Sequence, residues 1–235
     1  MALLVSAVFP AVVFLYFVYK KDTEKEPLKF LTHCFLWGCI ITVPSIYIEL
    51  FFSSFDNFDS ALAHSLYKAF VVAAFVEEGM KFLCFYRIVW GRKEFDQYYD
   101  GIVYAVFISL GFALIENISY VLDYGFVTAF WRGILAVPGH GLNGVIMGYF
   151  FALAKFSWNN RKRYLCLSIL IPLLAHGAYD FFAFYSSEQD NAALAILVFT
   201  GCVGLMALLW CLGIRYIKKH LTKDLKKFSM KRLWD

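Results

Sequence analysis

The chain has 235 residues, of which 61% are hydrophobic and only 17% are charged, and its formal net charge is +4. Soluble domains usually contain about 45–50% apolar and about 25% charged residues, so this composition excludes an ordinary soluble domain. It indicates a protein that crosses a membrane several times.

Apolar runs of about 20 residues, the length that a membrane-spanning helix needs, occur in seven places along the chain. In chain order they cover residues 1–19, 30–53, 61–86, 101–123, 128–156, 164–185 and 191–217. The first run lacks the basic start and the small-residue cleavage site of a signal peptide, so we interpret it as a retained span. Backbone groups within lipid must bond inside their own segment, so all seven are predicted to be helices. The predicted fold is an all-α polytopic bundle, with one membrane-embedded domain (1–217) and a basic cytoplasmic tail (218–235).

Basic residues fall in alternate connections between these spans. Lys and Arg occur in the segments 20–29, 87–100, 155–163 and 215–235, whereas 54–60, 124–127 and 186–190 contain neither. By the positive-inside rule the basic side is cytoplasmic, which places the N-terminus outside and the C-terminus in the cytoplasm. We expect the basic tail to contact anionic lipid of the bilayer, and we expect no nucleic-acid partner.

The third span contains two adjacent carboxylates, Glu77 and Glu78, followed by Lys81. One such charge near a helix centre costs about 2.5–3.5 kcal/mol even on lenient insertion scales, so the pair must be neutralised or functional. Lys81 lies four residues after Glu77 and three after Glu78, a spacing that lets it neutralise one carboxylate on the same helix face. A buried structural salt bridge is the alternative interpretation.

The next three spans carry further ionisable and amide side chains. They are Glu116, Asn117, Arg132, His140, Asn143, His176 and Asp180. At a rise of about 1.5 Å per residue, Glu77, Glu116 and the two histidines share a layer about 10 Å thick near the middle of the membrane. Asp180 follows His176 by four residues and could therefore orient its imidazole.

Three of these residues also have simpler interpretations. Glu116 could be a protonated core acid, and Asn143 could join two helices by a hydrogen bond. Arg132 lies near the outer end of its span, so we expect it to anchor at lipid headgroups or to pair with Asp123 or Glu188.

Two acids together with another acid and two histidines form a set that suits hydrolysis. A carboxylate in a low-dielectric site can take a proton from water that attacks a peptide carbonyl, and a histidine can stabilise the oxyanion. Alternatively, histidines and a glutamate could bind zinc, which itself activates the water. The sequence contains no HExxH, GxSxG, serine–lysine or GxGD arrangement, so it supports none of the mechanisms that these motifs indicate.

Four motifs, in order on successive spans, resemble those of the PrsW family of intramembrane proteases. EEGMK (Glu77–Lys81) matches the EExxK motif, and HGAYD (His176–Asp180) resembles the HxxxD motif. GFALIEN (Gly111–Asn117) and PGHGLNGVIMG (Pro138–Gly148) resemble the second and third motifs. The resemblance runs from Glu26 to the last span. It implies a multi-pass peptidase of a bacterial inner membrane, related to the Abi and CAAX-processing glutamate proteases.

The resemblance also implies roles for single residues. Glu77 and Glu78 would supply the water-activating base and His176 would be catalytic, with Glu116 and His140 as further site residues. Supporting positions are Lys81, Asn117, Asn143 and Asp180. A metal-free glutamate mechanism and a metal such as zinc both stay open; the candidate metal ligands are Glu78, Glu116, His140 and His176.

The implied substrate is a single-pass membrane protein, such as a membrane-anchored anti-sigma factor at its first cleavage. Some relatives act instead in bacteriocin defence or peptide maturation, so other substrates stay open.

Two other function classes also use intramembrane acids and histidines. A proton-coupled transporter could employ them as a relay, but the sequence shows no inverted repeat, and the charges gather in one layer without lining a path. A non-catalytic scaffold could retain the fold, but all four motifs are complete at the positions that carry chemistry. We therefore predict a protease.

Overall fold

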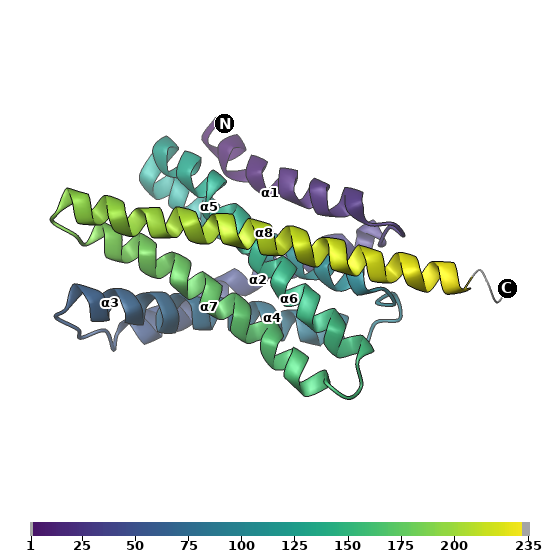
Figure 1. Cartoon of the computed structure of the whole chain (residues 1–235). Coiled ribbons are helices and arrows are strands. Elements are labelled where there is room, and N and C mark those ends of the chain that lie inside the picture. Colours follow the sequence, from purple (N-terminus) through teal and green to yellow (C-terminus); the bar gives the residue numbers. More distant parts are fainter. Residues whose placement is uncertain (1, 232–235) are drawn as a thin grey trace.

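The computed structural model describes residues 2–231 and the side chains of residues 3–226, and every regular element in this range is helical (Figure 1). The elements are α1 (Ala2–Lys21), α2 (Leu28–Ser53), α3 (Ala61–Tyr67), the π-helix η1 (Lys68–Ala74), α4 (Phe75–Val89), α5 (Tyr98–Ile134), α6 (Ala136–Phe156), α7 (Arg161–Ser187) and α8 (Ala192–Lys231). The predicted all-α fold is confirmed. Residue 1 of the first predicted span and residues 232–235 of the predicted tail lie outside the described residues.

Among the described residues, five helical stretches are long and apolar enough to cross a membrane. They are Leu3–Lys21, Leu28–Ser53, Tyr98–Phe156, Arg161–Ser187 and Ala192–Lys226. Large apolar side chains point outward on several of them: Phe9 is 64% exposed, Tyr47 70% and Ile196 66%. Such a surface suits lipid as the surrounding solvent, and the protein is a multi-pass membrane protein.

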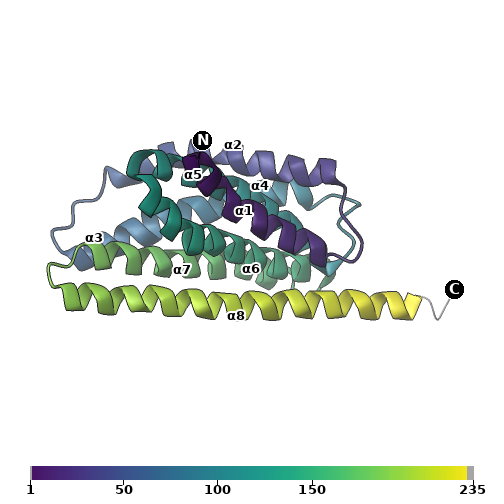
Figure 2. The same cartoon turned by 90° about the horizontal axis from the view of Figure 1, so that it is seen from above.

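The stretch from Tyr98 to Phe156 forms the centre of the bundle. In its most apolar window 72% of the residues are buried, against 17–22% in the windows of the other four stretches. Figure 2 shows α2 and α8 on opposite sides, with α5 and α6 between them. The two central helices approach closely at a pair of glycines, because a methyl group added to Gly148 would lie 2.2 Å from the carbonyl oxygen of Gly101.

The chain reverses direction at Gly125, within α5. Gly125 has φ 79° and ψ −159°, a conformation that is essentially restricted to glycine. Glu116 and Arg132 lie on either side of it, and an uninterrupted helix would separate them by about 24 Å. Their side chains are instead 2.9 Å apart, so residues 126–134 fold back against residues 116–120. The sequence predicted this break as a loop over residues 124–127.

The predicted third span, 61–86, is helical throughout but changes its hydrogen-bonding pattern. It begins as α3, continues as the π-helix η1 and ends as α4, without a gap between them. The backbone N–H of Phe75 donates to the carbonyl of Phe70, five residues earlier. Wider helical turns of this kind occur frequently at functional sites, and this one ends three residues before Glu77.

The last helix extends well past residue 217 into the segment predicted as a tail. Nε2 of His220 lies 2.9 Å from the carbonyl oxygen of Tyr149 on α6. The Asp224 carboxylate accepts the backbone N–H groups of Tyr98 and Tyr99, each at 2.9 Å. A carboxylate at this position satisfies N–H groups that have no partner within the first turn of α5. The segment 218–226 therefore packs against the bundle.

Candidate active site

The two adjacent carboxylates lie in the first turn of α4, inside the bundle. Glu77 is 5% exposed, Glu78 is 0% exposed and Lys81 is 1% exposed. Nζ of Lys81 donates to Oε2 of Glu77 and to Oε1 of Glu78, both at 2.9 Å. The predicted pairing along one helix face is confirmed, although the lysine contacts both carboxylates where neutralisation of one was expected. The buried Lys81 ammonium is thus the shared ion-pair partner of two buried carboxylates.

His140 on α6 joins this group to a third acid. Its Nδ1 lies 3.0 Å from Nζ of Lys81, and its Nε2 lies 2.9 Å from Oε2 of Glu116 on α5. An ammonium can only donate, so Nδ1 accepts and the imidazole proton lies on Nε2, toward Glu116. The backbone carbonyl of His140 accepts a hydrogen bond from the Ser109 hydroxyl at 2.9 Å. The contacts with Lys81 and Glu116 fix the position of the His140 ring.

Arg132 contacts the site instead of the headgroup region, so the prediction of a surface anchor, or of a pair with Asp123 or Glu188, was wrong. A guanidinium nitrogen lies 2.9 Å from Oε1 of Glu116. Its Nε donates to Oδ1 of Asn117 at 3.1 Å. The reason is the reversal at Gly125, which returns Arg132 to the level of Glu116. Asn117 itself donates to the carbonyl of Ala7 on α1 at 2.9 Å and supports the site through Arg132.

His176 on α7 lies between two carboxylates. Its Nδ1 is 2.9 Å from Oε1 of Glu78, and its Nε2 is 3.1 Å from Oδ2 of Asp180. The predicted orientation of the imidazole by Asp180 is therefore confirmed. The two histidine rings are perpendicular, with centroids 5.2 Å apart.

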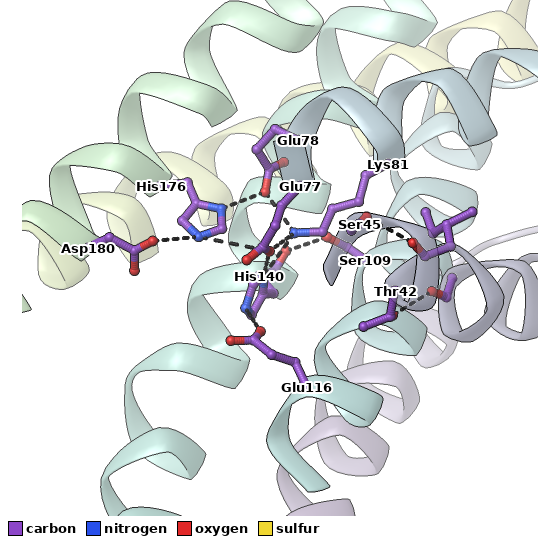
Figure 3. Close-up of polar contacts among 12 residues, drawn as sticks. Thr42, Ser45, Glu77, Glu78, Lys81, Ser109, Glu116, His140, His176 and Asp180 are labelled. Atoms are coloured by element: carbon purple, nitrogen blue, oxygen red, sulfur yellow. Dashed lines mark hydrogen bonds and ion pairs between the residues drawn. The ribbon is translucent and has the colours of Figure 1, made fainter. Parts of the chain in front are cut away.

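The side chains that were expected to meet from four segments lie together. Glu77, Glu116 and the two histidines converge from α4, α5, α6 and α7 (Figure 3). The group contains four carboxylates (Glu77, Glu78, Glu116 and Asp180) and two permanent cations (Lys81 and Arg132). His176 bonds a carboxylate through each ring nitrogen and therefore carries a proton on both, so four negative charges against three positive ones leave an excess of one when His140 is neutral. Such an excess, in a buried place, favours the binding of protons or of a cation.

A small cavity of about 30 Å³ lies beside the two histidines. Its lining includes Glu116, His140, Asn143, His176, Tyr179 and Asp180. Asn143 is 3% exposed, and its Oδ1 has no hydrogen-bond partner among the described residues. A polar cavity of this size can hold water, which needs two to four polar partners. Asn143, predicted as a supporting residue, therefore offers a free acceptor at the site.

Two residues near the site were not selected from the sequence. Tyr179 lines the cavity, and its position inside the HGAYD motif was the available signal. Glu49 lies on α2, near the end of the second predicted span. It is partly buried.

The residues fit a metal ion by the chemistry of their donor atoms. Glu77, Glu78, His140 and His176 each offer one oxygen or nitrogen, and these four atoms lie within 4.8 Å of one another. Carboxylate oxygen and imidazole nitrogen are ordinary ligands of zinc. Oε2 of Glu78 is buried and has no hydrogen-bond partner among the described residues. Glu116, expected as a ligand, lies outside this set and contacts the far side of the His140 ring.

Comparison with known proteins gives a consistent result. A family model described as PrsW family intramembrane metalloprotease matches residues 26–210. The chain is 36% identical over 219 residues to Protease PrsW of Oceanobacillus iheyensis, which covers 93% of this chain and 96% of that protein. It is 41% identical over 180 residues to Protease PrsW of Geobacillus kaustophilus (76% and 78%), and 33% identical over 220 residues to that of Bacillus subtilis (93% and 95%). No solved structure gives a significant match.

Proposed function

The chain belongs to the PrsW family of intramembrane metalloproteases and is a membrane-embedded hydrolase, and from this premise we propose that its buried Glu/His cluster is the active site. The observation that carries the proposal is the convergence of the side chains of four helices on one buried point. Glu77, Glu78 and His176 act directly, while Glu116 and His140 complete the site. A structural salt bridge of Glu77 and Glu78 with Lys81 does not account for the two histidines and the two further carboxylates beside it.

Glu77 is the base that takes a proton from the attacking water. Its Oε2 accepts a hydrogen bond from Lys81 and lies 3.9 Å from Nδ1 of His140 and 4.0 Å from Nε2 of His176. These separations exceed direct hydrogen bonds, so the carboxylate faces both rings without being tied to either. Glu78, by contrast, is fully buried and bonded through Oε1 to both Lys81 and His176. Glu78 therefore orients its neighbours, and Glu77 is the carboxylate available for proton transfer.

His176 stabilises the oxyanion that forms on the substrate carbonyl through the positive charge of its doubly protonated ring. Asp180 and Glu78 hold its ring from both sides, and the cavity of about 30 Å³ adjoins it. Preorganised electrostatic stabilisation in a water-poor site typically contributes about 10²–10³ in kcat. A metal held by Glu77, Glu78, His140 and His176 would supply Lewis-acid activation of the water, and zinc suits these donors.

The proposal includes seven membrane crossings, with the N-terminus outside and the C-terminus in the cytoplasm. Two observations support a number above five. The stretch Tyr98–Phe156 reverses at Gly125 and so supplies two crossings. The continuous segment α3, η1 and α4 adds 7, 7 and 15 residues, about 40 Å of helix at about 1.5 Å per residue, enough for a bilayer core of about 30 Å. The basic connections support the orientation, and the bacterial relatives support a bacterial cell membrane.

The substrate is proposed to be a single-pass membrane protein, such as an anti-sigma factor at its first cleavage. The support is the position of the site. Its glutamates and histidines are at most 6% exposed apart from Glu116, and they lie among helices whose outer faces suit lipid. A peptide segment that is already in the membrane can reach such a site from the side. The gathering of the charges in one cluster supports a peptidase over a proton-coupled transporter.

The test is cleavage of a single-pass substrate reconstituted with the purified protein in liposomes. Wild type should give two fragments, whereas Glu77→Gln, Glu78→Gln and His176→Ala should lower the rate at least about 10²-fold because each removes proton transfer or charge stabilisation. Glu94→Gln, which changes an exposed glutamate outside the cluster, is the matched control and should cleave normally. Size-exclusion profiles verify folding. Normal activity in all three site variants would refute the assignment.

A further inference from the structure

The Lys81 ammonium contacts three of the four residues that could hold a metal ion. Its Nζ lies 2.9 Å from Oε2 of Glu77, 2.9 Å from Oε1 of Glu78 and 3.0 Å from Nδ1 of His140. These three residues belong to the four-residue donor set, and an ammonium has three protons to donate. The Phe112 ring, 4.3 Å away, lies against the same ammonium. Every donor of Lys81 is thus directed at a possible metal ligand.

An ammonium and a metal ion cannot use these atoms together. Zinc binds oxygen and nitrogen at about 2.0–2.2 Å, so it would lie among the same acceptors that now surround Nζ. Two cations at such a short separation repel strongly in a buried site, where water screens little. Lys81 is 1% exposed, so it has no solvent around it in its present position. Occupation by one cation therefore requires the departure of the other.

We propose that the Lys81 ammonium is the resident counter-ion of the four-donor set in the metal-free protein, and that a divalent metal ion binds only when this ammonium moves away. Lys81 would then set the metal affinity of the site by competition. The inference concerns regulation of the proposed active site and rests on that function for its biological meaning. Its prediction, however, concerns metal binding and can be measured without any substrate.

The charge balance supports competition over cooperation. The cluster holds four carboxylates, two permanent cations and a His176 ring that donates to a carboxylate from each nitrogen, which leaves an excess of one negative charge with His140 neutral. Removal of the Lys81 charge raises that excess to two, frees Oε2 of Glu77 and removes one of the two donors that Oε1 of Glu78 accepts from. Both changes increase the attraction for a divalent ion. If Lys81 instead helped to hold the metal, the same removal would weaken binding.

The experiment is a metal titration of the full-length protein in detergent after treatment with a chelator. Zinc bound per chain is measured by equilibrium dialysis and elemental analysis for wild type, Lys81→Gln and Lys68→Gln. Lys68→Gln is the matched control, because Lys68 is an exposed lysine on the same continuous helical segment. We expect Lys81→Gln to bind zinc at least ten-fold more tightly than wild type and Lys68→Gln to equal wild type. Unchanged or weaker binding by folded Lys81→Gln, or no binding at all, would overturn the proposal.

A second measurement keeps the proposal testable if Lys81→Gln does not fold. Lys81→Arg keeps the positive charge and fills the place of the ammonium with a larger group, so it should bind zinc no more tightly than wild type. In wild-type protein, saturating zinc should change the labelling rate of Lys81 by an amine-directed reagent several-fold and leave that of Lys68 unchanged. Tighter binding by Lys81→Arg, or identical Lys81 labelling with and without bound zinc, would overturn it. Zinc binding without substrate cleavage would count only against the proposed protease site.

Discussion

The charged side chains of the site form one unbroken series of contacts across four helices. In order they are Arg132, Glu116, His140, Lys81, Glu78, His176 and Asp180. Each internal member of the series touches a partner on both sides. A change at one end therefore alters the orientation of groups that it does not touch, as second-layer partners of catalytic groups commonly do.

Arg132→Gln tests the outer end of this series. Loss of the guanidinium leaves Glu116 without its cation, so His140 loses the fixed acceptor for its Nε2 proton. We expect kcat to fall about 10- to 100-fold with little change in KM, because Arg132 positions other residues and does not bind substrate. Arg132→Lys keeps the positive charge beside Glu116, so kcat should fall less than in Arg132→Gln. Some loss of kcat should remain, because lysine cannot reproduce the hydrogen bond from Nε to Asn117. A wild-type kcat for Arg132→Gln would show that Arg132 does not position the catalytic groups.

Sequence spacing predicted the contacts within one helix but not those that depend on a turn. The pairs of Lys81 with its two glutamates and of His176 with Asp180 followed from helical periodicity. The approach of Arg132 to Glu116 did not, because it depends on the direction that the chain takes after Gly125. The contact of Lys81 with His140 joins residues 59 positions apart, and no local pattern indicates it.

Two local departures from regular helix shape the elements around the site. The π-helix η1 precedes Glu77, and the turn at Gly125 returns Arg132 to Glu116. Apolar length located the spans, and the short interruption at 124–127 anticipated the turn. The π-helix could not be predicted, since it depends on the hydrogen-bond partners of each backbone group. The packing of 218–226 was likewise missed, because a basic composition alone indicated a tail.

Gly125→Ala tests the turn within α5. A methyl group added at Gly125 would have no neighbour within 4 Å, so the cost of a side chain is conformational and not steric. With φ 79° and ψ −159°, that cost should be about 1–3 kcal/mol of the free energy of unfolding. Gly204→Ala in α8, where space is also open, is the matched control and should be neutral or stabilising by up to about 1 kcal/mol.

Unfolding by detergent titration measures both variants in the same mixed micelles. Equal free energies of unfolding for Gly125→Ala and Gly204→Ala would contradict the restricted backbone conformation at Gly125.

At the scale of the whole molecule, a second group of buried acids lies at one end of the bundle, where α1 connects to α2. Asp22 is 4% exposed and Glu26 is 7% exposed. Burial raises the pKa of Asp22 to about 6 and that of Glu26 to about 7. For Glu26, a hydrogen bond from the Tyr104 hydroxyl acts in the opposite direction and lowers the pKa. The folded protein therefore holds protons here that an unfolded chain would release near pH 4–5.

These raised pKa values predict a loss of stability on the alkaline side. A carboxyl group whose pKa is raised by folding stabilises the protein below its unfolded pKa, and this contribution is lost as pH rises through the folded value. We expect the melting temperature of wild type in detergent to fall between pH 5 and pH 8. Glu26→Gln should reduce that fall and stabilise the protein at pH 8 by an amount on the order of 2 kcal/mol.

The control for this prediction is Glu94→Gln, which changes an exposed acid and should shift the melting temperature equally at both pH values. A wild-type melting temperature that rises or stays level from pH 5 to pH 8 would be incompatible with buried, protonated Glu26.

The most direct measurement is the initial rate of substrate cleavage by Glu77→Gln in liposomes, beside wild type and Glu94→Gln. Glutamine keeps the shape of Glu77 and its hydrogen-bonding capacity toward Lys81, but it cannot take a proton from water. Loss of a general base should lower the rate about 10²–10⁴-fold, while Glu94→Gln cleaves at the wild-type rate. Cleavage by Glu77→Gln at the wild-type rate would show that this glutamate is not the base.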